Sequence, residues 1–591
     1  MNKECGIGET EILKLINNHS NLTQRKLSEM SGFSLGYVNK MITELTASGF
    51  ITNTLELTPS GNAFIKENRT RNAIILAAGY GMRMVPVNME TQKAFLEVNG
   101  EPLIERMICQ LQEKGITDIT IVVGYKKEQF EYLIDKYNVE LVVNSEYDTK
   151  NNLHSLNLVS DRISDTYIIP CDVWCKNNPF HSFELYSWYM IKDKEDEESM
   201  VRVNRKMELV RTNQTGNAMI GIAYIKDAQA PLIRERLQAY DGKKKYRDAF
   251  WEEVLYEKDK MIPYAKLAAN EDVVEINTYE QLRDIDKHSR QLDHEAIMIA
   301  KDVLNVNPTD LYNIHILKKG MTNRSFIFEC KNQKYIMRIP GEGTDQLIDR
   351  KKEYAVYQKI NSYHISDEVI YMNEKNGYKI TKYLEGARTC DALKEQDLIK
   401  CMEKLRKFHE MELTVEHSFD LFGQIQFYEK LWNGIPSAYR DYKETKKKVF
   451  SLKDFIDKQE KKNVLTHIDA VPDNFLFYED ADGKEKICLI DWEYAGMQDP
   501  HVDIAMFCIY AMYDKKAVDR LIDIYFENHC TINVRMKIYA YISVCGLLWS
   551  NWCEYKKTLG VDFGEYSLKQ YRYAKEYYKL VQAYIQEEED E

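Results

Sequence analysis

The 591-residue chain lacks long apolar runs and paired cysteines. It has no stretch of about 18 apolar residues, the length that spans a bilayer, and no basic, apolar leader at its start. Its 12 cysteines include no C-x-x-C pair, and Cys171 and Cys175 are the only closely spaced two. These absences argue against membrane insertion, a zinc site and a disulfide framework. We therefore expect a cytoplasmic protein with reduced thiols.

Positive charge is also scarce. The 80 Lys and Arg residues face 93 Asp and Glu residues, which gives a net charge of −13. Such a field repels nucleic acid phosphates, so small molecules are the expected partners. The length predicts three or four domains.

Residues 1–70 contain three short blocks with helical periodicity. Thr23 and Ser34 are predicted N-caps, and Gly32 falls where a tight turn between helices is needed. The segment resembles a winged helix-turn-helix domain, with Phe50 to Gly61 as the wing. Seven Lys or Arg residues balance seven Glu residues here, whereas DNA-binding domains usually carry a basic surface. A role in dimerisation or in packing within the chain is therefore favoured over DNA binding.

Two larger segments follow. In residues 71–290, short apolar strands alternate with helical stretches, which predicts a Rossmann-like α/β domain with a mostly parallel sheet. In residues 294–591 the strands come first and the helices later, which predicts an α+β domain with a small sheet lobe and a helical lobe.

A glycine-rich loop follows the first strand of the second segment. Gly79 and Gly81 let the backbone turn tightly and approach phosphate oxygens. The extended string from Leu76 through Thr91-Gln-Lys93 to Leu103 resembles the nucleoside-triphosphate transferase family. The resemblance implies that Arg83 and Lys93 neutralise the triphosphate, with Lys93 near the α-phosphate.

The same resemblance implies a magnesium site. Asp172 stands at the end of an apolar strand, where the family carries its metal aspartate. Asn277 is assigned as the second ligand, and Glu275 is kept as the alternative. Magnesium usually takes only one or two protein oxygens, and substrate phosphates and water complete its shell.

The string Asn144, Tyr147, Asn152 and Ser155 is similar to bacterial CTP:phosphocholine cytidylyltransferases. Trp174, Trp251 and Glu252 are predicted to form an aromatic and acidic pocket. A quaternary ammonium group offers no hydrogen-bond donor, so aromatic faces and negative charge recognise it. The alternative for both tryptophans is a place in the hydrophobic core.

The third segment carries His467-x-Asp469-x4-Asn474, followed by Asp491-Trp492 at a strand end. This pattern is typical of phosphoryl transfer. Asp469 is the predicted base that accepts a hydroxyl proton, and Asn474 and Asp491 are the predicted magnesium ligands. Asp503 matches the position that braces the catalytic loop in the aminoglycoside phosphotransferase-like family, which this segment resembles.

This segment resembles the choline kinase branch of the aminoglycoside phosphotransferase-like family. The resemblance implies a phosphate-covering hairpin with Thr322 and Asn323, and an Arg338–Glu353 pair that positions the phosphates of ATP. Four aromatic residues are expected to hold the trimethylammonium head: Trp549, Trp552, Tyr494 and Trp492. Cys508, Ile509 and Tyr510 stand where eukaryotic relatives have an acidic residue.

These observations predict a bifunctional enzyme that phosphorylates choline with ATP and Mg²⁺ and then transfers a cytidylyl group from CTP, yielding CDP-choline. One alternative is the same pair of steps on ethanolamine or another amino alcohol. An alternative of another class is a regulator that binds DNA through the winged helix and senses metabolites. Homodimerisation is also considered.

Overall fold

The computed structural model describes residues 5–81, 84–87, 91–269, 271–317, 323–341, 347–480, 482–561 and 563–590. The chain divides into two compact units, and the boundary falls between Ile297 and Met298. The winged helix and the α/β domain share the first unit. The domain limits at residues 70/71 and 290/294 stay predictions.

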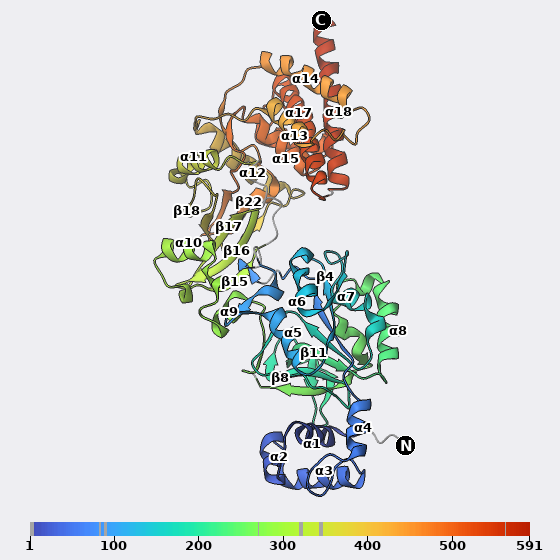
Figure 1. Ribbon diagram of the computed structural model, residues 1–591. Coiled ribbons are helices and arrows are strands. Elements are labelled where there is room, and N and C mark those ends of the chain that lie inside the picture. The colour runs from blue at the N-terminus through green and yellow to red at the C-terminus, as the bar shows by residue number, and fades with distance from the viewer. Residues whose placement is uncertain are drawn as a thin grey trace. The chain divides into compact units, whose positions relative to one another are not determined.

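The N-terminal segment forms the predicted winged helix (Figure 1). Its helices are α1 (Ile7–Asn18), α2 (Gln24–Ser31), α3 (Leu35–Ala47) and α4 (Pro59–Glu67). The Thr23 and Ser34 side chains cap α2 and α3 as predicted, and Gly32 ends α2 with a φ of 70°. The wing is shorter than predicted, because one bridge joins Ile51 to Leu57 and α4 already begins at Pro59. Proline at the first helical position favours this early start.

Helix α1 is anchored to the α/β domain by a buried ion pair. Lys14 Nζ lies 2.6 Å from Glu184 Oε2, and the two side chains are 3% and 0% exposed. Tyr167 donates a 2.9 Å hydrogen bond to Glu184. Phe183, next to Glu184, belongs to the same hydrophobic cluster as Leu13 and Leu45. The winged helix therefore shares a core with the α/β domain.

The α/β domain is built on one large twisted sheet of ten strands among the described residues. Its parallel half has the order β5-β4-β1-β6, and β11, β8, β13, β10 and β9 continue it with mixed directions. The strands are β1 (Asn72–Ala77), β4 (Asp118–Val123), β5 (Glu140–Val143), β6 (Thr166–Pro170), β8 (Trp188–Asp196), β9 (Val201–Val203), β10 (Glu208–Arg211), β11 (Gly216–Ile225), β12 (Tyr256–Glu257) and β13 (Lys260–Ala268). The α/β prediction is confirmed.

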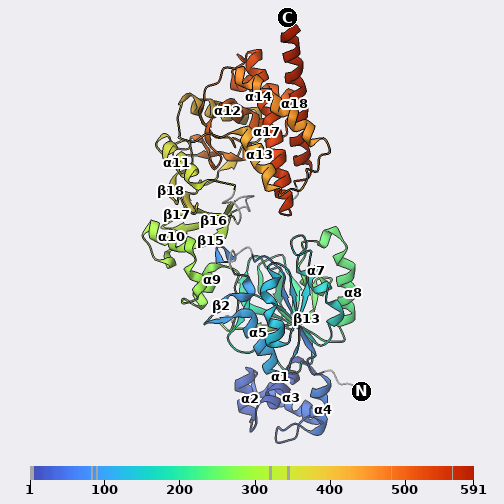
Figure 2. The same cartoon turned by 45° about the horizontal axis from the view of Figure 1, so that its top comes forward.

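Helices cover both faces of this sheet (Figures 1 and 2). Alternate residues of β1 point to opposite faces. Ile75 packs in a cluster with residues of α5 (Leu103–Glu113) and α6 (Tyr132–Tyr137), whereas Ile74 packs with α7 (Asn152–Asn157) and α8 (Ala230–Asp241). The remaining elements are β2 (Glu97–Val98), β3 (Glu101–Pro102), β7 (Val173–Cys175), β14 (Val273–Glu275) and α9 (Tyr279–Ile285).

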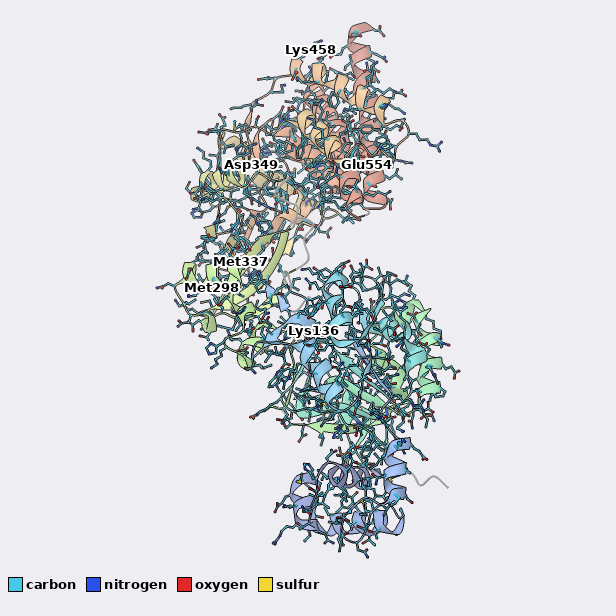
Figure 3. The ribbon with its side chains drawn as sticks, viewed as in Figure 1. Lys136, Met298, Met337, Asp349, Lys458 and Glu554 are labelled. Atoms are coloured by element: carbon cyan, nitrogen blue, oxygen red, sulfur yellow. The ribbon has the colours of Figure 1, made fainter. Side chains whose placement is uncertain are left out.

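The second unit begins with a small sheet lobe. Antiparallel strands follow the order β15-β16-β17-β19-β18, and α11 (Arg350–Ile360) lies in the same lobe. The strands are β15 (Tyr312–Ile316), β16 (Asn323–Cys330), β17 (Gln333–Pro340), β18 (Val369–Met372) and β19 (Lys379–Lys382), and α10 (Glu295–Leu304) precedes them. Met337 and Asp349 lie in this lobe, whereas Lys458 and Glu554 lie in the helical lobe (Figure 3).

The helical lobe follows, as the sequence predicts. Its helices are α12 (Glu395–Glu410), α13 (Leu421–Leu431), α14 (Tyr442–Lys458), α15 (His501–Tyr510), α16 (Lys515–Tyr525), α17 (Ile532–Thr558) and α18 (Glu565–Asp590). Short strands carry the loops of the site: β20 (Arg388–Thr389), β21 (Val464–Thr466), β22 (Phe475–Glu479), β23 (Glu485–Leu489) and β24 (Gly496–Gln498). Helices α17 and α18 pack side by side along the lobe (Figure 2). In the part of the chain described, no helix is long and apolar enough to cross a membrane.

We predict that Lys14→Met loosens the first unit, because it leaves the Glu184 carboxylate buried beside fewer cations. Breaking a buried pair in this way costs about 3–5 kcal/mol. Hydrogen exchange of the full chain, read by mass spectrometry, should show lost protection in α1 and around Glu184, with the second unit unchanged.

Lys40→Met is the matched control, since Lys40 pairs with Glu44 at 3.9 Å and its side chain is 66% exposed. A surface pair contributes at most about 1 kcal/mol. The double variant Lys14→Met, Glu184→Met should recover most of the protection. Equal effects of Lys14→Met and Lys40→Met would contradict the anchoring role.

Candidate active sites

The catalytic loop of the second unit is held by one buried carboxylate. Asp503, in the first turn of α15, accepts backbone hydrogen bonds from His467 (3.0 Å) and Ile468 (2.7 Å). His409 Nε2 lies 3.0 Å from the same carboxylate, which is fully buried. Ile468 has a φ of 70°, an unfavourable value for a β-branched residue. The two hydrogen bonds hold this strained conformation next to Asp469, which is the bracing role predicted for Asp503.

His467 ties this loop to the strand end that carries Asp491. Burial lowers the pKa of His467 to about 4, so its ring is neutral at pH 7. The ring nitrogen Nε2 then donates to the carbonyl oxygen of Ile490 over 3.0 Å. Ile490 N in turn donates to Asn474 O over 2.9 Å. The loop and the strand end are thereby fixed relative to each other.

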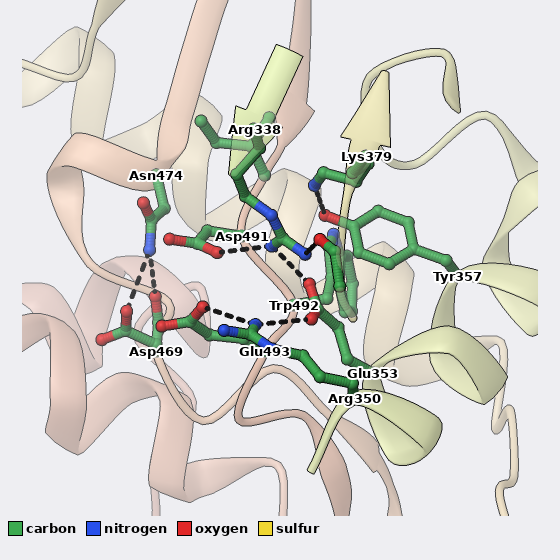
Figure 4. A network of polar contacts seen from close by, with 12 residues as sticks. Arg338, Arg350, Glu353, Tyr357, Lys379, Asp469, Asn474, Asp491, Trp492 and Glu493 are labelled. Carbon is green, nitrogen blue, oxygen red and sulfur yellow. Dashed lines mark hydrogen bonds and ion pairs between the residues drawn. The ribbon is translucent and has the colours of Figure 1, made fainter. Parts of the chain in front are cut away.

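Asp469, Asn474 and Asp491 come together as predicted (Figure 4). Asn474 Nδ2 donates to the backbone oxygen of Asp469 over 2.8 Å and to its Oδ2 over 3.2 Å. The amide oxygen of Asn474 is thereby turned away from Asp469. Burial, followed by the negative charge of Asp491, raises the pKa of Asp469 to about 7. A carboxylate with this pKa is suited to accept a proton near neutral pH.

Arg338 and Glu353 form the predicted ion pair. Arg338 NH1 lies 2.5 Å from Glu353 Oε1 and 3.9 Å from Asp491 Oδ1 (Figure 4). Burial on its own lowers the pKa of Arg338, but the Glu353 carboxylate outweighs it and raises the pKa. Arg350 NH1 also contacts Glu353, at 3.1 Å. Helix α11 thus fixes a permanent cation beside Asp491.

A cavity of about 590 Å³ runs from this cluster to the aromatic residues. Trp549 and Trp552 lie on α17 with ring centroids 5.3 Å apart, and the Tyr494 ring lies 5.8 Å from Trp549. All three rings line the cavity, as does Asp469. An acceptor hydroxyl near Asp469 could therefore belong to a molecule whose other end meets aromatic faces.

Trp492 does not belong to this aromatic wall, so its predicted contact with substrate is wrong. Its ring is fully buried, donates to the carbonyl oxygen of Leu489 over 2.7 Å, and lies 4.4 Å from the His467 ring. Trp492 follows Asp491 directly, and its side chain faces the core while that of Asp491 faces the cavity. Its role is to pack beneath the catalytic loop.

The cavity wall also includes residues that the sequence pattern did not assign to it, among them Tyr510, Tyr566 and Asp473. Tyr510 and Tyr566 add aromatic faces, and Asp473 adds a carboxylate that accepts a 2.7 Å hydrogen bond from Tyr510. Cys508 and Ile509 are fully buried, so of the three residues at the departing position only Tyr510 reaches the cavity. Asp367, Glu493 and Asp473 add carboxylates to the lining instead, and Asp473 stands next to Asn474 in the catalytic string. Its place in that string was the available signal.

The first unit has a second candidate site at the carboxyl ends of β1 and β6. Gly79, Gly81, Lys93 and Asp172 line a pocket of about 230 Å³. The predicted string Asn144, Tyr147, Asn152 and Ser155 lines it too. Ligands of open α/β sheets bind at this edge.

The two predicted metal ligands of this site both contact the ammonium group of Lys93. Lys93 Nζ lies 3.0 Å from Asp172 Oδ2 and 2.7 Å from Asn277 Oδ1. The ammonium group therefore bridges the two oxygens, and a carboxylate with an amide oxygen is a ligand set that suits Mg²⁺. Asn277, the assigned second ligand, contacts the same ammonium group as Asp172, and Glu275 stays the alternative. Within the described residues, no group of three or more His, Cys, Asp or Glu side chains forms a further metal site.

The two predicted tryptophans of this pocket are placed elsewhere. Trp251 is 1% exposed and packs in the core beside Tyr189, so its predicted contact with substrate is wrong and the core alternative holds. The guanidinium carbon of Arg106 lies 5.7 Å from the ring centroid of Trp174. Trp174 is not among the described residues that line the pocket. Glu252 accepts a hydrogen bond from Tyr189 over 2.9 Å, and burial raises its pKa to about 7.

Some predicted residues cannot be placed. Arg83 and Thr322 lie outside the described residues, as does the side chain of Asn323. Their roles stay predictions.

Comparisons with known proteins agree with these two sites. Three family models match the chain: a winged helix-turn-helix DNA-binding domain at residues 9–52, a MobA-like NTP transferase domain at 73–179, and a choline/ethanolamine kinase at 314–543. The fold and the sites thus define a transferase with a nucleotidyltransferase domain and a kinase domain.

One relative identifies the family of the nucleotidyltransferase domain. The chain is 33% identical over 221 residues to choline-phosphate cytidylyltransferase of Streptococcus pneumoniae, covering 36% of this chain and 96% of that one. It therefore belongs to the choline-phosphate cytidylyltransferase family, and it also carries a choline/ethanolamine kinase domain.

Two relatives match the kinase domain. Protein LicA of Haemophilus influenzae is 29% identical over 264 residues, covering 42% of this chain and 95% of that one. The crystal structure of choline kinase LicA from Streptococcus pneumoniae is 26% identical, with a TM-score of 0.42, and covers 48% of this chain and 98% of that one.

We predict that Asp503→Asn lowers kcat of the kinase by about 100-fold, since misplacing a catalytic group by about 1 Å has this effect. One of the two backbone N–H groups would then face an amide NH₂. KM for ATP should change little, and cytidylyl transfer by the same chain is the internal control. Unchanged kcat in steady-state assays would contradict the bracing role.

The pH dependence of the kinase follows from Asp469, whose pKa is raised to about 7. The base works only when ionised, so we expect kcat/KM for the acceptor alcohol to rise as the pH increases through about 7 and then to level off. A cation bound at Asp491 offsets its charge, so kcat at saturating Mg²⁺ should titrate at lower pH. Rates between about pH 5.5 and pH 8.5 that do not vary would contradict Asp469 as the base.

Proposed function

We propose that this protein makes CDP-choline in two steps. The kinase domain transfers the γ-phosphoryl group of ATP to the hydroxyl of choline, and the nucleotidyltransferase domain joins the resulting phosphocholine to the CMP part of CTP, with pyrophosphate leaving. The observation that carries the proposal is the aromatic wall of Trp549, Trp552 and Tyr494 in the same cavity as Asp469. It suits a cationic head that cannot donate hydrogen bonds.

In the kinase step, Asp469 takes the proton from the choline hydroxyl as its oxygen attacks the γ-phosphorus. Arg338, fixed by Glu353, faces the negative charge of the triphosphate. Asn474 and Asp491 would hold Mg²⁺, which neutralises phosphate charge during transfer. Asp473 places a negative charge on the same cavity wall as the aromatic rings, which favours a cationic substrate.

In the second step, a phosphate oxygen of phosphocholine attacks the α-phosphorus of CTP in line with the leaving pyrophosphate. The loop at Gly79 and Gly81 offers backbone N–H groups to the triphosphate, and Lys93 neutralises it. Asp172 and Asn277 would hold Mg²⁺ on the phosphate oxygens. Tyr147, which lines the pocket, and Tyr80, whose ring lies 5.2 Å from that of Tyr147, are the candidate contacts for the cationic head, whereas Glu252 is not among the described residues that line this pocket.

Incubation of the full chain with choline, ATP, CTP and Mg²⁺ should give CDP-choline, detected by mass spectrometry. Asp469→Asn should lower the choline-dependent rate by at least about 1000-fold and leave turnover of added phosphocholine intact. Asp172→Asn should do the reverse, so that phosphocholine accumulates. Loss of both steps in either variant would contradict the assignment of separate sites.

The preference of the kinase for choline over ethanolamine tests whether the aromatic wall binds the trimethylammonium group. A desolvated cation–π contact contributes about 2 kcal/mol, so Trp549→Ala should raise KM for choline about 30-fold. Trp549→Phe keeps an aromatic face and should retain most of the affinity. If the unmodified chain prefers ethanolamine, or if both variants behave alike, the wall does not select a methylated ammonium group.

A further inference from the structure

The inference concerns Lys93, and it rests on the proposed cytidylyltransferase function. Its ammonium group lies between the two oxygens assigned to the metal, 3.0 Å from Asp172 Oδ2 and 2.7 Å from Asn277 Oδ1. The side chains of Lys93 and Asp172 are only 11% and 16% exposed.

We propose that Lys93 is a built-in placeholder for the metal ion. Before substrate arrives, its ammonium group neutralises Asp172 and occupies the position between the two ligands. The metal can enter only when Lys93 leaves, and a triphosphate in the glycine loop offers Lys93 its alternative partner. The metal and the nucleotide therefore enter together, and free metal binds poorly.

Room for this arrangement comes from Gly81. A Cβ atom at this position would lie 2.7 Å from Cγ of Lys93 and 3.0 Å from its Cδ, so any larger residue would collide with the lysine chain. Gly81 also has a φ of 63°, which disfavours other residues. The loop thus leaves a channel along which the Lys93 side chain reaches the metal ligands.

The backbone of the two ligand residues is held by contacts other than those with Lys93. Ile276 N donates to the backbone oxygen of Asp172 over 2.8 Å, which ties the segment before Asn277 to Asp172. Asn277 N donates to Gln281 Oε1 over 2.6 Å at the start of α9. Removing the lysine should therefore leave the backbone of both residues in place and release the two oxygens to a cation.

Binding of Mn²⁺ without nucleotide, measured by electron paramagnetic resonance, tests this proposal. The full chain would carry Asp491→Asn throughout, so that the kinase site contributes no metal binding. In that background, Lys93→Met should tighten Mn²⁺ binding at least about tenfold. Adding Asp172→Asn to Lys93→Met should abolish the gain, which places the added ion at Asp172.

The matched control is Lys150→Met. Lys150 lines the same pocket but pairs with Glu146 at 3.1 Å and Asp241 at 3.6 Å, not with the metal ligands. Lys150→Met removes one positive charge, as Lys93→Met does, but it does not free an oxygen of Asp172 or Asn277. Mn²⁺ binding should therefore change by less than about threefold. Equal gains in the two variants, or no gain in Lys93→Met, would overturn the placeholder role.

A nucleotide arm separates this proposal from the function on which it rests. With CTP present, the Asp491→Asn chain should bind Mn²⁺ at least about tenfold more tightly than without it, because the triphosphate supplies metal ligands and draws Lys93 away. Absence of any Mn²⁺–CTP binding would contradict the proposed transferase itself. Normal Mn²⁺–CTP binding with no effect of Lys93→Met would contradict only the placeholder.

Discussion

The structure depends on buried carboxylates that are each matched by a cation from a distant segment. Arg338 meets Glu353 in the sheet lobe, Lys93 meets Asp172 beside the glycine loop, and Lys14 meets Glu184 under the winged helix. A carboxylate at these depths is costly unless paired, so each contact fixes where two segments must meet. In the two enzyme sites, the same pairing also sets a positive charge where phosphate would bind.

The residues around Asp469 show the opposite use of charge. Its pKa is raised because burial and Asp491 act together, and no described cation lies within ion-pair distance of it. Asp503, only 34 positions later in the sequence, is instead satisfied by three donors and acts as a rigid brace. Asp469 is thus suited to accept a proton, whereas Asp503 has a structural role. Partners, rather than residue type, separate catalytic from structural acids.

The sequence predicted the parts of each site that depend on local order. Asp469, Asn474 and Asp491 sit at fixed spacings around strand ends, and the chain direction alone brings them together. Trp492 and Trp251 were misjudged for a physical reason: a side chain beside a catalytic residue points to the core as often as to the cavity, and the residue pattern does not say which. Tyr566 reaches the cavity wall through tertiary packing, which no spacing in the sequence encodes, whereas Asp473 could have been found from its place beside Asn474. Asn277 was identified from its resemblance, and its contact with Lys93 could come only from the folded chain.

The contacts of the winged helix favour a structural role in the first unit over DNA binding. A DNA-reading domain usually has a basic surface and some freedom to move, whereas this one is electrically balanced and shares a core with the nucleotidyltransferase. The segment that receives Lys14 connects β7, which follows Asp172 directly, to β8. The relative in Streptococcus pneumoniae is matched over 96% of its length by 221 residues, which are 36% of this chain. Because loss of either partner of a buried ion pair leaves the other charge uncompensated, Glu184 ties the winged helix to the sheet at whose edge Asp172 lies.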